Sequence, residues 1–186
     1  NATLVGVVNA DIGLNIPDFR SGEKTFQLLY QASGRVGRSQ KPGEVIIQSF
    51  SLDNSAIQNA ARLELKEYYK LILKEREELN YPPYSWLSKI ELIGVSKSYL
   101  SSIAQKFKHN LRGKFKGLEV LGPAPCYYEK IRNQYRFQFI LKSSKTLDPN
   151  SKKLHKFVET NFLNHRFKIN YNKCKVNIHR DPLNLN

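Results

Sequence analysis

The residues with the clearest chemical signature form a string of glutamine, glycine and arginine, Gln31-Ala32-Ser33-Gly34-Arg35-Val36-Gly37-Arg38. The string lies at the end of a segment with helical periodicity, and arginines three residues apart on a helical turn point the same way. The two glycines, Gly34 and Gly37, lack side chains that would hold a polyphosphate away from the backbone. A fork of two guanidinium groups suits the charge on a γ-phosphoryl group during its transfer. The string therefore predicts that Arg35 and Arg38 contact a nucleotide.

The same string has a purely structural alternative. Arginine near the C-terminal end of a helix interacts favourably with the negative end of the helix dipole, and glycine commonly caps that end. A single glycine–arginine pair would favour this alternative, whereas the full string with its preceding Gln31 favours the phosphate role. Asp11, which follows an apolar strand-like run, could be a catalytic carboxylate. For Asp11 we favour a hydrogen-bonding role, either within its loop or between two lobes of the protein.

The charge of the chain is concentrated in its second half. The 186 residues include 30 lysines and arginines and 16 aspartates and glutamates, which gives a net charge of +14. Residues 1–85 hold 10 basic and 10 acidic side chains, and residues 86–186 hold 20 basic and 6 acidic ones, so the whole excess lies in the second half. Such an excess repels itself without an anionic partner, which makes nucleic acid the expected ligand. A generally lysine-rich composition would instead spread the charge evenly.

Cations alternate with aromatic residues in the middle of the basic half, in the run Tyr127-Tyr128-Glu129-Lys130-Ile131-Arg132-Asn133-Gln134-Tyr135-Arg136-Phe137. Arginine and lysine neutralise phosphates and aromatic rings stack on unpaired bases, a combination typical of sequence-tolerant single-strand binding. We therefore predict a central hairpin loop whose nucleic-acid contacts are Lys130, Arg132, Tyr135 and Arg136. The alternative is that Tyr135 and Phe137 alternate into the core of a strand, and for Phe137 this alternative is favoured.

A second group of cations surrounds the start of a predicted helix at 150–163, and its members are Lys142, Lys145, Lys152, Lys153 and Lys156. Such a run is usually a solvated helix face. His109, His165 and His179 have no metal-ligand spacing, so no metal site is predicted.

The first eighty residues predict a strand, a helix, a second strand and a second helix. A short apolar strand covers 3–8, a helix starts near Ser21, a strand covers 44–50, and a long amphipathic helix covers 54–80. This order is typical of an α/β layer with a parallel sheet, in which functional loops follow the C-terminal ends of the strands. The run Tyr81-Pro82-Pro83-Tyr84 ends the long helix, because proline cannot continue it.

Beyond these prolines the pattern predicts the order βαββαβ. The expected strands are 86–95, 118–121, 134–142 and 174–179, and the expected helices are 97–112 and 150–163. This is the split-βαβ plan, in which two helices cover one face of a four-stranded sheet and the other face can meet a ligand. The predicted organisation is an α/β part at 1–53, a connecting helix and proline-rich linker at 54–84, and a basic α+β domain at 85–186.

The two cysteines, Cys126 and Cys174, are far apart and form no C-x-x-C pair, so neither a disulfide framework nor a zinc site is expected. We interpret both as buried thiols of a cytoplasmic protein. No apolar run is long enough to span a bilayer and no secretory signal is visible. Because the chain begins at Asn1 and contains no methionine, we expect a fragment of a longer protein.

The string at 31–38 resembles motif VI of superfamily 2 helicases, and its surroundings resemble one family among them, the PriA replication-restart helicases. The segments that carry this resemblance are Ala10–Leu14, Pro17–Ser21, Glu23-Lys24, Phe26–Leu29, Gly43–Val45, Glu75-Arg76, Tyr81–Tyr84, Val120–Pro125, Tyr135–Gln138 and Asp181-Pro182. Motif VI alone indicates only the superfamily, whereas P-D-F-R followed by Y-P-P-Y and L-G-P-A-P indicates the family. The resemblance spans nearly the whole chain.

The resemblance implies specific roles for the string. Arg38 and Arg35 would contact the γ-phosphate of ATP from the second RecA-like lobe, with Gly34 and Gly37 beside the nucleotide, and Gln31 would couple nucleotide state to the first lobe. No phosphate-cradling G-x-x-x-x-G-K-[ST] loop and no acidic box for magnesium occur in the chain. The zinc-binding cysteines of the family are absent as well. ATP, magnesium and zinc are therefore expected only in the full-length protein, and this piece alone should be inactive.

The resemblance also implies the biological context. The full-length enzyme would be a DNA helicase of 3′ to 5′ polarity that recognises stalled or branched forks and restarts replication by primosome assembly. Its C-terminal domain, similar in fold to a small-subunit ribosomal protein, would bind branched DNA and the acidic tail of the single-stranded DNA-binding protein. The lysine cluster around the predicted helix at 150–163 would attract this acidic peptide, and the predicted contacts are Lys145, Lys152 and Lys153. Other primosome proteins are expected partners, and no membrane is. The alternatives are a non-enzymatic, ribosomal-type RNA-binding module and another branch-specific translocase or RNA helicase.

Overall fold

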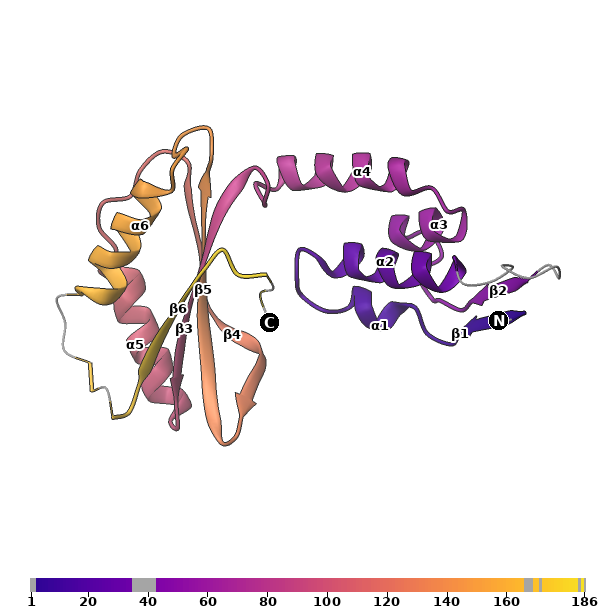
Figure 1. Ribbon diagram of the computed structural model, residues 1–186. Coiled ribbons are helices and arrows are strands. Elements are labelled where there is room, and N and C mark those ends of the chain that lie inside the picture. The colour runs from indigo at the N-terminus through magenta and orange to yellow at the C-terminus, as the bar shows by residue number, and fades with distance from the viewer. Residues whose placement is uncertain (1–2, 35–42, 166–168, 171, 184, 186) are drawn as a thin grey trace. The chain divides into compact units, whose positions relative to one another are not determined.

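The computed structural model describes residues 3–34, 43–165, 169–170, 172–183 and 185 (Figure 1). The chain divides into two compact units, Asn1–Glu75 and Arg76–Asn186. Each unit has its own hydrophobic core.

The first unit is built on two parallel strands. β1 (Leu4–Val7) pairs with β2 (Glu44–Ile47) from Leu4 opposite Glu44 to Val7 opposite Ile47. The predicted parallel pairing is thus confirmed. Two helices follow β1 in the chain before β2. They are α1 (Asp11–Leu14) and α2 (Ser21–Ser33), and α2 begins at the predicted residue.

The prediction of one long helix at 54–80 is wrong. The structure has α3 (Ser55–Ala61) and α4 (Leu65–Glu78), separated at Leu63, whose φ is +58°. The sequence around Leu63 consists of good helix formers, so propensity does not reveal the break. Packing explains it, because the turn allows Tyr68 of α4 to stack on Phe26 of α2 with ring centroids 4.0 Å apart.

The second unit has the predicted element order βαββαβ. Its elements are β3 (Ser85–Gly94), α5 (Lys97–His109), β4 (Leu118–Ile131), β5 (Gln134–Ser144), α6 (Lys152–Val158) with a π-helical turn (Glu159–Leu163), and β6 (Lys175–Arg180). The strands form an antiparallel sheet in the order β4-β5-β3-β6. Because β5 lies between β3 and β4, the β3–α5–β4 connection is a split βαβ unit.

The two faces of this sheet differ in character. Successive strand residues point to opposite faces, so Ile90 and Leu92 of β3 and Phe139 and Leu141 of β5 all enter the core beneath α5 and α6. Figure 1 shows both helices on the same side of the sheet. Charged side chains such as Glu91 and Arg136 alternate with these apolar residues and therefore lie on the face that the helices leave open.

β4 is much longer than the strand predicted at 118–121. It continues to Ile131 and forms a hairpin with β5, closed by Arg132 and Asn133 with φ values of +48° and +63°. Positive φ at both central residues is the geometry of a two-residue turn that matches the twist of antiparallel strands. The run 127–137 therefore belongs to the two strands except at Arg132 and Asn133, and it is not a loop as predicted.

The start of α6 depends on a single buried carboxylate. Asp148 accepts hydrogen bonds from the backbone N–H of Lys153 at 3.1 Å and of Leu154 at 3.0 Å, and from Ser143 Oγ at 3.1 Å. Burial acts to raise the pKa of Asp148, but these hydrogen bonds outweigh it and hold the pKa below its ordinary value. The ionised carboxylate is thus preferred in the folded state.

Asp148→Ala is expected to lower the free energy of unfolding by about 2 kcal/mol, because it removes a helix cap and leaves buried donors without partners. Urea denaturation at neutral pH measures this loss, and Glu159→Ala, which removes an exposed carboxylate, should change stability little. Because the folded pKa is depressed, the stabilisation is present above the unfolded pKa and is lost as the pH falls through the folded pKa. The difference between wild type and Asp148→Ala should therefore shrink in acid, and a difference that persists there would contradict the capping role.

Candidate nucleic-acid interface

The tip of the β4–β5 hairpin presents the predicted cations to solvent. The strands pair at Lys130 opposite Tyr135 and at Ile131 opposite Gln134, and the turn carries Arg132. Lys130 and Arg132 are both exposed. Lys130 Nζ lies 4.9 Å from the centre of the Tyr135 ring, so the cation is held at the edge of the hairpin by a cation–π contact.

The exposed aromatic residues of the hairpin are Tyr127 and Tyr128. The pairing of β4 with β5 is irregular between Pro125 and Lys130, and within this break Tyr127 and Tyr128 are 48% and 56% exposed. Their rings meet edge to face with centroids 4.9 Å apart. Tyr135, the aromatic contact predicted from sequence, instead packs partly buried against the core.

Phe137 is buried in the core of the second unit, which confirms the core interpretation for this residue. The sequence could not place Tyr127 and Tyr128 outside the strand ladder, because an irregular pairing depends on the partner strand.

Arg136 does not lie with the other predicted contacts. Its Nε donates to Glu91 Oε1 at 3.0 Å, its Nη2 bonds the same oxygen, and its side chain is 15% exposed. Strand alternation places Arg136 on the open face of the sheet, whereas Tyr135, with Lys130 above it, points to the helix side. Burial acts to raise the pKa of Glu91, but Arg136 and Lys89 hold that pKa below its ordinary value. The hairpin tip therefore brings Lys130, Arg132 and Tyr135 together, whereas Arg136 lies on the open face of the sheet, and nucleic-acid contact by these four residues stays a prediction.

The lysine cluster gathers at the start of α6, with one exception. Lys145 Nζ lies 4.1 Å from the centre of the Trp86 ring, Lys153 Nζ donates to the Leu147 carbonyl at 2.7 Å, and Lys152 is exposed. Lys142 instead is buried, where it bonds the Leu79 carbonyl at 2.9 Å and pairs with Glu119 at 2.7 Å. The cluster thus combines cations with one face of an indole ring.

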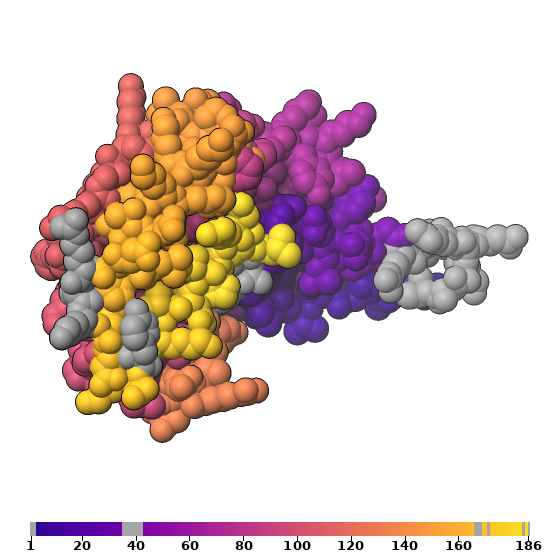
Figure 2. Space-filling view, turned by 60° about the vertical axis from the view of Figure 1, so that its left-hand side comes forward, coloured from indigo at the N-terminus to yellow at the C-terminus, as the bar shows by residue number. Residues whose placement is uncertain are grey.

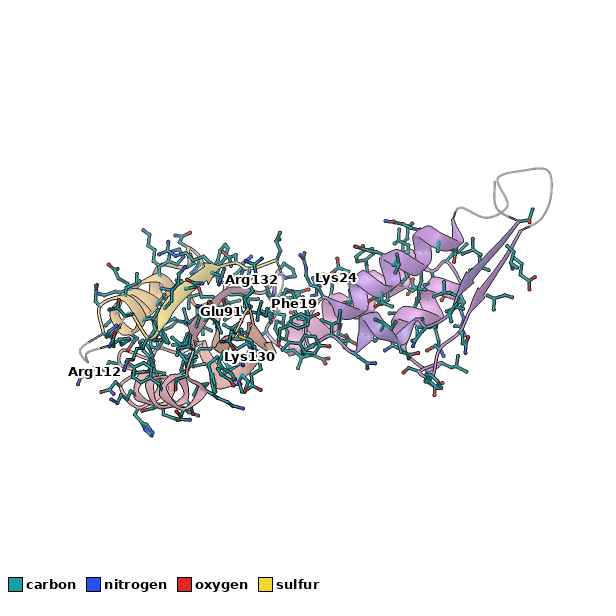
Figure 3. The ribbon with its side chains drawn as sticks, turned by 90° about the horizontal axis from the view of Figure 1, so that it is seen from below. Phe19, Lys24, Glu91, Arg112, Lys130 and Arg132 are labelled. Carbon is teal, nitrogen blue, oxygen red and sulfur yellow. The ribbon has the colours of Figure 1, made fainter. Side chains whose placement is uncertain are left out.

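A third group of cations was not singled out from the sequence. The segment 106–116 ends α5 and begins the following loop, and its exposed cations are Lys106, Lys108, Arg112, Lys114 and Lys116. None of them forms an ion pair with a described residue. Figure 3 shows Arg112 at the end of this unit away from Lys130 and Arg132. The signal was present in the sequence, since these five cations lie within eleven positions that contain no acidic residue.

The described part of the 31–38 string ends α2. Gln31 is exposed on the last turn, and Gly34 is the C-cap residue, whose N–H bonds the Tyr30 carbonyl at 2.9 Å. Arg35, Gly37 and Arg38 lie outside the described residues. Their predicted contact with a nucleotide therefore stays a prediction.

Asp11 connects the ends of the two parallel strands. Its carboxylate accepts from Ser49 Oγ at 3.0 Å and from the Phe50 N–H at 2.9 Å. Hydrogen bonds from Ser51 and Phe50 hold the pKa of Asp11 below its ordinary value. These contacts agree with the hydrogen-bonding interpretation of Asp11 and give its carboxylate a structural role in the loop.

The remaining candidate groups are simple to place. Cys126 and Cys174 are buried, as predicted, and burial raises the pKa of each thiol to about 11. Among residues 3–34, 43–165 and the described part of the C-terminal segment, no cluster of histidine, cysteine or acidic side chains could hold a metal ion. Over the same residues, no helix is both long and apolar enough to cross a membrane.

The second unit is thus a mixed α/β domain with a four-stranded antiparallel sheet, and it carries three groups of exposed cations. A family model described as "Primosomal protein N C-terminal domain" matches residues 77–183. The chain belongs to the PriA family of replication restart proteins and corresponds to the C-terminal region of its members.

Similar curated proteins come from distant bacteria. Replication restart protein PriA of Bacillus subtilis (strain 168) is 40% identical over 143 residues, which are 76% of this chain and 18% of that protein. Replication restart protein PriA of Chlamydia pneumoniae is 38% identical over 154 residues, 82% of this chain and 20% of that protein. The Synechocystis protein of the same name is 39% identical over 141 residues. The chain therefore spans about a fifth of the length of these relatives.

Proposed function

We propose that this chain is the C-terminal part of an ATP-dependent DNA helicase of 3′ to 5′ polarity that recognises stalled or branched forks and restarts replication by primosome assembly. The observation that carries the proposal is the excess of exposed cations on a domain of the PriA family. In a helicase this surface would hold the DNA while the nucleotide motor moves along it.

The hairpin tip is the proposed DNA contact. Lys130 and Arg132 would neutralise backbone phosphates, and the exposed rings of Tyr127 and Tyr128 would stack on unpaired bases beside them. Stacking accepts every base, so this surface would bind a fork by its unpaired strand and not by its sequence. Tyr135 would act indirectly, since it holds the Lys130 ammonium in place.

The first unit would be part of the second RecA-like lobe. Its parallel strands and the helix between them carry the string at 31–38, in which Arg38 and Arg35 would contact the γ-phosphate of ATP. Residues outside this chain would provide the phosphate-cradling loop, the magnesium carboxylate and the zinc-binding cysteines. ATP, magnesium and zinc thus belong to the whole protein.

The cluster at the start of α6 would bind an acidic peptide, such as the tail of the single-stranded DNA-binding protein. Lys145, Lys152 and Lys153 supply positive charge, and Trp86 offers an apolar face next to them. A peptide with acidic and aromatic residues would pair its carboxylates with these cations and pack its rings beside the indole.

The proposal is tested by fluorescence anisotropy with the full 186-residue chain. Forked DNA with an unpaired arm should bind more tightly than duplex DNA, and log K should fall steeply with log salt because several phosphates are neutralised. The chain should show no ATPase activity above background. A preference for double-stranded RNA would instead favour the ribosomal-type RNA-binding module, and absence of binding at low salt would refute a nucleic-acid function.

A further inference from the structure

The open face of the second unit contains a pocket that the hairpin and the lysine cluster do not use. It lies beside β3, β5 and β6, and its volume is about 440 Å³. Figure 2 shows β6 and the residues after it, in yellow, as part of the outer surface of this unit. The polar residues that line it are Lys89, Glu91, Arg136, His179 and Arg180, and the apolar ones are Pro182 and Leu183.

The ammonium group of Lys89 is buried in this wall. The Lys89 side chain is 4% exposed, and its Nζ lies 3.6 Å from Glu91 Oε1. Its hydrogen bond goes to the Leu185 carbonyl at 3.1 Å. A buried ammonium is costly unless it is paired and hydrogen-bonded, so Lys89 depends on the charges around the pocket.

Glu91 provides the single carboxylate among the residues that line the pocket. Glu91 Oε1 accepts both Nε and Nη2 of Arg136 and also lies near Lys89, and Glu91 Oε2 lies 3.9 Å from His179 Nε2. One carboxylate balances one positive charge. Lys89, Arg136 and Arg180 carry three positive charges, so two of them remain unbalanced by this carboxylate.

A phosphomonoester matches this excess in charge. It carries a charge of about −1.5 to −2 at neutral pH and offers three strong acceptor oxygens, whereas a peptide carboxylate carries one charge and would leave the second cation unbalanced. The volume exceeds what a phosphate needs, and Pro182 and Leu183 provide an apolar wall against which a sugar or base can pack.

We propose that this pocket binds the terminal phosphate of a nucleotide, with Arg180 as the exposed cation, Arg136 as the partly buried one and Lys89 as the buried one. The group could come from a free mononucleotide or from the phosphorylated end of a DNA strand. The site is separate from the hairpin tip, so it does not require the proposed DNA contact to be correct.

Calorimetric titration of the full chain with thymidine 5′-monophosphate tests the pocket, with thymidine as the ligand that lacks the phosphate. Arg180→Gln should weaken binding of the monophosphate by about tenfold or more, since it removes a charged hydrogen-bond donor. The matched control is Lys175→Gln, which removes an exposed cation from the same strand at a position outside the pocket wall. The control should change the affinity less than twofold, and thymidine should not bind.

Further ligands identify the source of the phosphate. A single-stranded oligonucleotide with a 5′-phosphate is compared with the same strand that carries a 5′-hydroxyl. Tighter binding of the phosphorylated strand, with the difference lost in Arg180→Gln, indicates that the pocket binds a strand end. Equal binding of the two strands together with binding of the monophosphate indicates a free nucleotide. The double change Lys130→Ala and Arg132→Ala should weaken binding of both oligonucleotides but leave binding of the monophosphate unchanged. The experiment therefore distinguishes an error in the pocket proposal from an error in the proposed DNA contact at the hairpin.

Three results would overturn the proposal. The first is that the monophosphate does not bind at millimolar concentration. The second is that Arg180→Gln and Lys175→Gln weaken its binding equally. The third is that an acidic peptide binds at this site more tightly than the monophosphate. Because Arg180 is exposed, the variant should retain the wild-type melting temperature, and that measurement accompanies each titration.

Discussion

Arg38→Ala in the full-length protein, which we propose to be a helicase, is expected to reduce ATP turnover by about 10³-fold or more. The physical reason is the charge that spreads over the γ-phosphoryl oxygens during transfer, which an arginine finger stabilises more strongly in the transition state than in the ground state. Steady-state hydrolysis with saturating DNA measures the effect. The loss should appear mainly in kcat, because ground-state binding of ATP depends on the phosphate-cradling loop of the other lobe.

Two further variants make this result specific. Arg35→Ala should also reduce turnover, since both guanidinium groups belong to the same string, and Arg62→Ala, which removes an exposed arginine of the same unit, should leave turnover within twofold. A loss smaller than tenfold in Arg38→Ala would transfer the finger role to Arg35 or to a residue outside the string. Retained melting behaviour and DNA binding would show that the loss is one of catalysis.

The double change Lys130→Ala and Arg132→Ala is expected to flatten the salt dependence of DNA binding. Each phosphate contact contributes about 0.9 to the slope of log K against log salt on duplex DNA and about 0.7 on single strands. Loss of two contacts should therefore reduce the slope by about 1.5 to 2 and weaken binding of all sequences alike. Anisotropy titrations of the full chain with a forked DNA over a range of salt concentrations measure both quantities.

A charge-matched variant separates contact from overall charge. Lys66 and Lys74 are exposed on α4, and their replacement by alanine removes the same number of charges far from the hairpin in sequence. This control should keep the wild-type slope. If the hairpin variant also keeps that slope, the DNA contacts belong elsewhere, and the cations of 106–116 become the better candidates.

The sequence by itself determined the order of elements and the location of the charge. Strand and helix periodicity are properties of neighbouring residues, so the βαββαβ order and the parallel strand pair were predictable without knowledge of the packing. The concentration of cations in residues 86–186 and the motifs that resemble the PriA family are likewise readable from the printed letters.

Only the tertiary structure decided where individual side chains lie. The break at Leu63 allows a ring contact between two helices that are distant in the chain, although the local sequence favours a continuous helix. The Arg136 side chain is held by Glu91, which lies 45 positions earlier in the chain. The Lys89 ammonium donates to a carbonyl 96 positions later. Strand order brings these groups together on the open face. A pattern within one segment holds no information on that order, which is why the sequence indicated a nucleic-acid surface at the hairpin but not the pocket beside it.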